Sequence, residues 1–210
     1  MESLCELYYD PIYTYALYSG NRPDDAMDLT HGFFEHVLQS DVFARADANK
    51  GRLRSFLLMS FKNFASVKRR NGLAAKRGGS AVITSLDTED QYGVAGVDKV
   101  KGSELSPEEA YDKAFALVQL DRAVELLREE YSKSERVEIF DALRSKLKGD
   151  DNSYEEPARQ LGIPKETARV HVHRMRKRLG EIFRSVVFDS ISDPAIVDDE
   201  IRALRMALGS

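Results

Sequence analysis

The fold is decided by the stretch from Ser153 to Arg184, which has the sequence SYEEPARQLGIPKETARVHVHRMRKRLGEIFR. It contains two segments with helical spacing, separated by a turn at Gly162 and Pro164. Glycine accepts the left-handed backbone at the end of a helix, and proline is accepted at the first position of a helix. The stretch therefore predicts a helix-turn-helix.

The first helix of this pair is predicted to begin with a capping box. Ser153 is followed three residues later by Glu156, and in a capping box two such side chains bond to each other's backbone N–H groups. Pro157 would then occupy the fourth helical position, where proline loses a hydrogen bond and crowds the carbonyl four residues back. We therefore expect this helix to bend near Pro157.

The second helix carries two opposed stripes of side chains. The apolar stripe consists of Ala168, Val172, Met175 and Leu179. The opposite stripe consists of Thr167, His171, Arg174 and Arg178, with Lys165, Arg169, Arg176 and Lys177 beside it. Steps of three and four place each set on one face of a helix. The polar face suits DNA phosphates and base edges; the alternative is a basic face that is only solvated.

Charge along the chain is distributed in blocks. The whole chain has 31 basic and 35 acidic residues, a net charge of −4. Residues 50–77 have a net charge of +9 and residues 158–185 a net charge of +6, whereas the other segments are acidic, with −7 over 1–49, −9 over 78–157 and −3 over 186–210. Two separate basic islands predict two contacts with a polyanion, and the acidic blocks suit a basic protein partner.

Composition and periodicity predict an all-α protein with two helical domains joined by a flexible linker. The chain has 210 residues, of which 42% are hydrophobic, and no alternating pattern is long enough to define a sheet. The expected segments are a first domain at 1–77, a glycine-rich linker at 78–107, a second domain at 108–188 and an acidic tail at 189–210. The second domain would begin its first helix at Ser106-Pro107.

Three helices are expected in the first domain, at residues 2–18, from Pro23 onward, and after Gly51. In the third helix, the spacing predicts an inner face of Leu53, Leu57, Ser60, Phe64 and Val67. The outer face would then carry Met59, Lys62, Ser66 and Arg69. Because this helix lies in a basic island, we expect its outer face to contact DNA.

Catalysis, metal binding and membrane insertion find no support in the sequence. His171 and His173 are two residues apart, which places their rings on different helical faces, so they are a poor metal pair. No phosphate loop or nucleophile motif occurs, and we expect neither enzymatic activity nor a cofactor or metal. Cys5 is the single cysteine, and no apolar run is long enough to span a bilayer, so the default expectation is a cytoplasmic protein.

In order and spacing, the motifs resemble those of bacterial sigma factors of the extracytoplasmic-function group, the promoter-recognition subunits of RNA polymerase. DDAMDLTHGFF at 24–34 resembles the family's helix that binds core polymerase. RLRSFL at 52–57, continuing through Lys62-Asn63-Phe64, is similar to the helix that opens the minus-ten element and reads its upstream edge. The helix-turn-helix resembles the region that reads the minus-thirty-five element.

The resemblance implies two sets of contact residues. Core polymerase, through its β′ and β subunits, would be bound by Asp24, Asp25, Asp28, Leu29, His31 and Phe34. Promoter DNA would be bound by Lys62, Asn63, Ser66, Arg69 and Arg70 in the first domain, and by Lys165, Glu166, Thr167, Arg169, His171, Arg174, Arg176 and Lys177 in the second. The resemblance also allows a further partner, either an anti-sigma factor or a regulatory kinase.

Two other functions remain open at this stage. A dimeric helix-turn-helix repressor would bind a palindrome without polymerase. A sigma-like decoy would sequester an anti-sigma protein without binding promoters.

Overall fold

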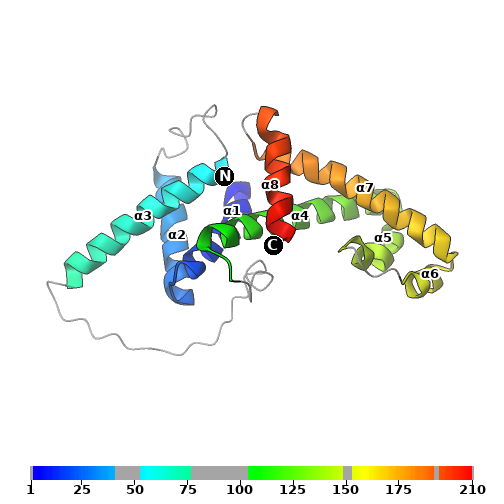
Figure 1. The fold of residues 1–210 in the computed structure, drawn as a ribbon, viewed down its shortest axis with the longest axis horizontal. Coiled ribbons are helices and arrows are strands. Elements are labelled where there is room, and N and C mark those ends of the chain that lie inside the picture. Colours follow the sequence, from blue (N-terminus) through cyan, green and yellow to red (C-terminus); the bar gives the residue numbers. More distant parts are fainter. Residues whose placement is uncertain (1, 41–52, 77–103, 149–152, 192–193, 210) are drawn as a thin grey trace. The chain divides into compact units, whose positions relative to one another are not determined.

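The computed structural model describes residues 2–40, 53–76, 104–148, 153–191 and 194–209, and every element within these ranges is a helix (Figure 1). The α-helices are α1 (Glu2–Tyr18), α2 (Pro23–Gln39), α3 (Leu53–Lys76), α4 (Pro107–Lys133), α5 (Val137–Leu143), α6 (Glu155–Leu161), α7 (Lys165–Asp189) and α8 (Val197–Gly209). Two short 3-10 helices, η1 (Arg144–Lys148) and η2 (Pro194–Ile196), complete the described elements. The expectation of an all-α fold is confirmed. Most of the predicted linker lies outside the described residues.

The chain divides into two compact units. Unit 1 comprises Met1–Val118 together with Ser190–Ser210, and unit 2 comprises Gln119–Asp189. The first part of α4 and the C-terminal helix α8 therefore belong to the same unit as α1, α2 and α3.

Unit 1 has an aromatic core. Phe33 of α2 and Phe61 of α3 are each 1% exposed, and their rings meet edge to face with centroids 5.3 Å apart. Tyr8 of α1 stacks on Phe115 of α4 at 5.2 Å. Aromatic pairs in these arrangements add to the free energy gained by burying their area.

The predicted inner face of α3 is wrong in part. Leu57 is fully buried as expected, but its buried neighbours are Arg54 and Phe61, whereas Val67 is 44% exposed. The helix carries apolar residues on more than one side, so spacing alone does not select the face. The larger Phe61 enters the core, and two carboxylates make the burial of Arg54 possible.

The apolar stripe predicted on the second helix of the helix-turn-helix packs inward in unit 2. Ala168, Val172 and Met175 of α7 are at most 1% exposed, and Phe140 and Leu143 of α5 are fully buried. The predicted turn is also present. Gly162 has φ 63° and ψ 28°, and the N–H of Ile163 donates to the carbonyl of Ala158 at 3.0 Å, as in a Schellman motif.

The predicted capping box at the start of α6 is absent. The residue that precedes the first helical residue is Tyr154, which is 5% exposed and makes no capping bond with its side chain, and the Ser153 hydroxyl donates to the Glu155 carboxylate at 3.0 Å. Because α6 begins at Glu155, Pro157 is its third residue and not its fourth. The N–H groups of the first turn have no partner within a helix, so proline costs no hydrogen bond there and the reason for expecting a bend disappears.

A capping box is present at the start of α4. The N–H of Glu109 donates to the Ser106 hydroxyl at 3.3 Å, and the N–H of Ser106 donates to the Glu109 carboxylate at 2.8 Å. This reciprocal pair fixes the helix start that the sequence predicts there.

Within the described residues, no helix is both long enough and apolar enough to cross a membrane.

Candidate nucleic-acid interfaces

The outer face of α7 is the first candidate interface. The helix exposes six basic or polar side chains together with one acid: Lys165, Glu166, Thr167, Arg169, Arg174, Arg176 and Lys177. His171 also lies on α7 but is half-buried. All eight predicted contact residues of the second domain are thus on one helix, directly after the turn at Gly162.

Two of these side chains also have partners inside unit 2. Lys165 bonds to Glu155 of α6, and this hydrogen bond lowers the pKa of the Glu155 carboxyl to about 2. The Arg176 guanidinium donates to the carbonyl of Lys146 in η1 at 2.6 Å. Both contacts tie the start and the middle of α7 to neighbouring elements, while Glu166 and Arg169 in the first two turns are exposed.

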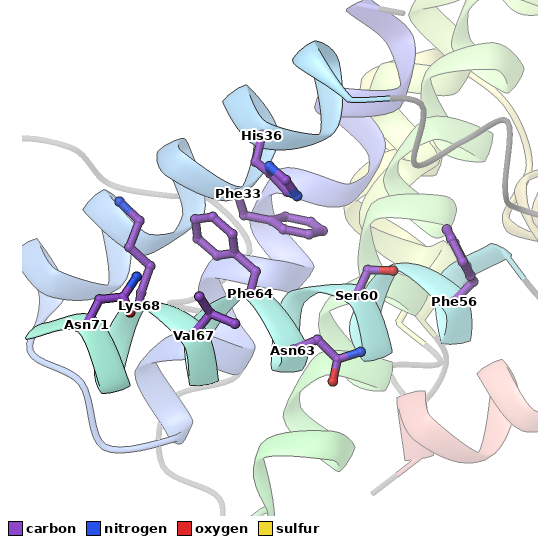
Figure 2. Close-up of a pocket in the computed structure, with 9 residues that line it drawn as sticks. All are labelled: Phe33, His36, Phe56, Ser60, Asn63, Phe64, Val67, Lys68 and Asn71. Carbon is purple, nitrogen blue, oxygen red and sulfur yellow. The ribbon is translucent and has the colours of Figure 1, made fainter.

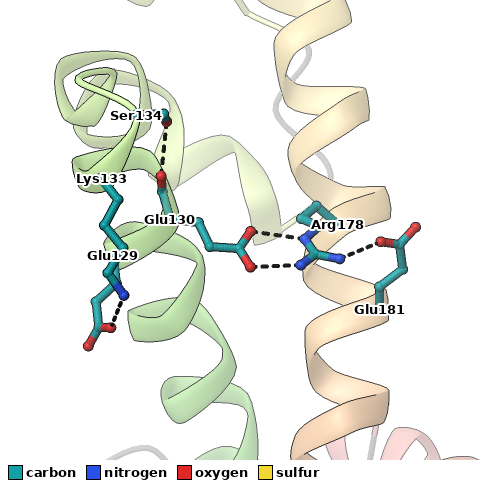
Figure 3. Close-up of polar contacts among 6 residues, drawn as sticks. All are labelled: Glu129, Glu130, Lys133, Ser134, Arg178 and Glu181. Carbon is teal, nitrogen blue, oxygen red and sulfur yellow. Dashed lines mark hydrogen bonds and ion pairs between the residues drawn. The ribbon is translucent and has the colours of Figure 1, made fainter.

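Arg178 holds two helices together, although its position in the sequence places it in the polar stripe of α7. Its guanidinium donates to both carboxylate oxygens of Glu130 on α4, at 2.9 and 2.7 Å, and to Glu181 at 2.8 Å (Figure 3). This two-pronged pairing raises the pKa of Arg178 and lowers that of Glu130. Periodicity cannot reveal this role, because Glu130 lies 48 residues away in the sequence.

The second candidate interface is a pocket between α2 and α3 in unit 1. Its volume is about 550 Å³, within the range of sites that hold small organic ligands. It is lined by Phe33, His36, Phe56, Ser60, Asn63, Phe64, Val67, Lys68 and Asn71 (Figure 2).

Phe64 is the central aromatic residue of this pocket. Its ring stacks on the His36 ring at 5.6 Å and meets the Phe33 ring at 5.8 Å. The Lys68 ammonium lies 5.7 Å from the centre of the Phe64 ring. Gly32 of α2 lies beside the ring, and a Cβ atom there would be 3.4 Å from the Phe64 side chain, an ordinary van der Waals contact. Aromatic faces beside amide groups and a cation suit an unstacked base and its phosphate.

Only one of the five residues predicted to bind DNA in the first domain lines this pocket. That residue is Asn63. The Ser66 hydroxyl donates to the carbonyl of Lys62 at 2.8 Å, and Arg69 and Arg70 are exposed on α3.

Lys62 has its partners within unit 1. Its ammonium donates to Glu108 of α4 at 2.5 Å and lies 5.3 Å from the centre of the Tyr15 ring. The hydrogen bond that Lys62 donates to Glu108 raises the pKa of Lys62. The lysine therefore contributes to packing between α1, α3 and α4.

The pocket contains residues for which the sequence predicted no contact with DNA. Phe33 and His36 come from α2, a helix to which only protein contacts were assigned, while Ser60, Lys68 and Asn71 lie on α3. A signal was available for Lys68, which directly precedes the predicted Arg69 in the basic island. No local signal exists for His36, because its role depends on how α2 packs against α3.

The acidic start of α2 is the candidate protein-binding face. Asp24, Asp25 and Asp28 are exposed, as is His31, and Leu29 is half-buried. Acids in a first helical turn also interact favourably with the helix dipole.

Tyr9 of α1 extends this face, and the sequence did not single it out. The Tyr9 hydroxyl and Nε2 of His31 share a hydrogen bond of 2.8 Å, and the Tyr9 ring stacks on Phe34 at 6.0 Å. Phe34 itself is only 6% exposed, so its side chain acts from beneath, by supporting Tyr9.

Comparisons with family models, with curated proteins and with solved structures give no match. Within the described residues, no group of three His, Cys, Asp or Glu side chains is placed to hold a metal ion.

Proposed function

We propose that this protein is a promoter-specificity subunit of RNA polymerase, of the kind found among extracytoplasmic-function sigma factors. The observation that carries the proposal is the presence in one chain of two different surfaces suited to DNA. Unit 2 offers a helix suited to duplex DNA, and unit 1 offers a pocket suited to a base outside the duplex. A protein that both locates and opens a promoter needs both.

In this proposal α7 lies in the major groove of the upstream promoter element. Its first two turns carry Glu166 and Arg169, both exposed, where a docked recognition helix reaches base edges. Arginine pairs with two acceptors of guanine, and glutamate accepts from cytosine. Arg176 and Lys177 lie further along the helix, at the level of the phosphates.

The pocket of unit 1 receives an unstacked base of the nontemplate strand. Phe64 and His36 supply ring faces, Asn63 and Asn71 supply amide groups that can bond to a base edge, and the Lys68 ammonium can neutralise a phosphate. Stacking on an aromatic side chain is worth about 1 to 3 kcal/mol per base, which offsets much of the free energy lost when the base leaves the duplex. The pocket thereby stabilises the open strand by binding, without covalent chemistry.

Core polymerase is the proposed partner of the acidic face on α2. Three exposed carboxylates beside Tyr9 and His31 complement a basic protein surface and repel DNA. The same acidic charge weakens binding of the free protein to DNA, so promoter binding would depend on assembly with polymerase. An anti-sigma protein or a kinase acting on this face would be a regulator of that step.

Selection from a random duplex DNA library, with and without core polymerase, tests this function. We expect enrichment of a site with two separated elements, only when polymerase is present. Enrichment of a palindrome by the protein alone would instead identify a dimeric repressor. Absence of any DNA enrichment, with and without polymerase, would overturn the proposal and leave the decoy, which sequesters an anti-sigma protein without binding promoters.

A further inference from the structure

The C-terminal helix α8 contributes a buried carboxylate to unit 1. Glu200 is 2% exposed, and its carboxylate accepts two hydrogen bonds from the Arg54 guanidinium of α3. One comes from Nε, and the other comes from Nη2 at 3.5 Å. The two residues are 146 positions apart in the sequence. Val197, Ile201 and Leu204 of α8 are buried beside Glu200 along the same helix. The predicted acidic tail thus includes a helix whose acidic residue at position 200 points inward.

Arg54 is held from several sides at the start of α3. Its guanidinium also pairs with Asp112 of α4 and lies 5.9 Å from the centre of the Phe115 ring. Its backbone carbonyl accepts a hydrogen bond of 2.8 Å from the Tyr111 hydroxyl. The Asp112 side chain is 43% exposed, so Glu200 is the more buried of the two carboxylates.

These contacts fix the first turn of the helix that builds the pocket. Phe56 and Ser60, which line one end of the pocket, follow Arg54 on α3 by two and by six residues (Figure 2). A charge pair buried in this way fixes geometry more than it adds stability, because each partner is satisfied in only one arrangement. A shift at Arg54 would therefore be transmitted to Phe56 and Ser60 through the helix.

We infer that Glu200 is a positioning residue for the pocket between α2 and α3, and that it acts through Arg54. This inference rests on the proposed function of the pocket. In this inference, helix α8 helps unit 1 to hold an opened promoter strand, while α7 in unit 2 reads the duplex.

The test compares two promoter fragments bound by the full chain assembled with core polymerase. One fragment is fully duplex, and the other has its downstream element held open by mismatches; both carry the site enriched in the selection above. In Glu200→Gln the carboxylate becomes a neutral amide of nearly the same shape. We expect this variant to lose about tenfold in affinity for the opened fragment, with affinity for the duplex fragment unchanged.

Asp199→Asn is the matched control, because Asp199 is exposed on the same helix and pairs with Arg202. It should bind both fragments as the parent protein does. The double variant Arg54→Met/Glu200→Met removes both buried charges; Asp112 loses its pairing with Arg54 but is 43% exposed, so no buried charge is left behind and the test stays decisive if Glu200→Gln does not fold. It too should lose affinity for the opened fragment alone.

Two results would overturn the inference. One is unchanged preference for the opened fragment in both Glu200 variants. The other is an equal loss of duplex binding and of opened-fragment binding, which is what a merely structural residue would give. If the parent protein itself shows no preference for the opened fragment, the proposed function of the pocket fails, and the failure is distinguishable from that of Glu200 alone.

Discussion

Phe64 is the residue on which the pocket between α2 and α3 depends most. Its ring contacts His36, Phe33 and Lys68, and each of these residues also lines the pocket. Sequence spacing placed Phe64 on the inner face of α3, but could not show that it meets a histidine from α2. That contact depends on packing between helices that are distant in the chain.

Phe64→Ala should therefore weaken binding of an opened promoter strand by roughly 1 to 3 kcal/mol, the usual effect of removing a stacking ring. Ser55→Ala is the control, because Ser55 is exposed on the same helix, does not line the pocket and is not among the residues predicted to bind DNA. Fluorescence anisotropy of the mismatched promoter fragment, with core polymerase present, measures both. Equal affinities for the two variants would remove Phe64 from the binding site.

Glu155 provides a prediction about pH. Its hydrogen bond from Lys165 lowers the pKa of Glu155 from 4.5 to about 2. Since the folded-state pKa is depressed, the contribution of this contact is present above pH 4.5 and is lost as the pH falls toward 2. In Lys165→Met, NMR titration should find the Glu155 midpoint moved back toward 4.5. An unchanged midpoint would show that Lys165 is not the partner of Glu155. Because both residues are solvent-exposed, added salt should also weaken the shift in the pKa of Glu155.

Among the elements, α7 is the helix that our proposal divides into a first part that reads bases and a later part that binds phosphates. Arg169→Ala should relax preference at one or two base positions and cost roughly 1 to 3 kcal/mol at the preferred site. Arg176→Ala should weaken all sequences alike and reduce the salt dependence by about one unit per phosphate contact removed. Promoter-library transcription with each variant measures both. The proposed register of α7 in the groove is wrong if Arg176→Ala changes base preference and Arg169→Ala does not.

The sequence predicts the helices better than it predicts their faces and caps. The helix at Glu2–Tyr18, the helix starting at Pro23 and the turn at Gly162 are as expected, because helical periodicity, proline and glycine act locally. The capping box at Ser153 failed because the buried Tyr154 precedes the first helical residue, a tertiary effect. The predicted inner face of α3 is wrong in part, because the buried Arg54 pairs with carboxylates on α4 and α8, which lie far away in the sequence.

For the whole molecule, the acidic face of α2 predicts that promoter binding depends on assembly with core polymerase. Asp25→Lys/Asp28→Lys should abolish assembly with polymerase and leave the fold intact, since both side chains are exposed. Glu6→Lys/Glu104→Lys is the control; it changes the net charge equally at exposed sites outside α2. Co-purification with core enzyme measures assembly. Unimpaired assembly of the Asp25/Asp28 variant would exclude this face as the docking site.

Because Ser190–Ser210 belongs to unit 1, we predict that deleting this segment destabilises unit 1 and not unit 2. Ending the chain after Asp189 removes α8 and its three buried aliphatic side chains, each worth about 1.5 to 3 kcal/mol when buried. Hydrogen exchange should therefore become faster in α1 and α3, while the core of unit 2 around Val172 keeps its protection. Loss of protection in unit 2 alone would contradict the assignment of α8 to unit 1. No local pattern in the sequence reveals this, because an amphipathic helix does not specify which unit it packs against.

We propose that this protein directs core RNA polymerase to specific promoters. Run-off transcription with purified core polymerase and a genomic promoter library is the decisive measurement. We predict transcripts from a defined set of promoters that share two separated elements, that require this protein, and that are lost with Phe64→Ala and with Asp25→Lys/Asp28→Lys. The claim would be contradicted if core polymerase gave the same transcripts with and without the protein.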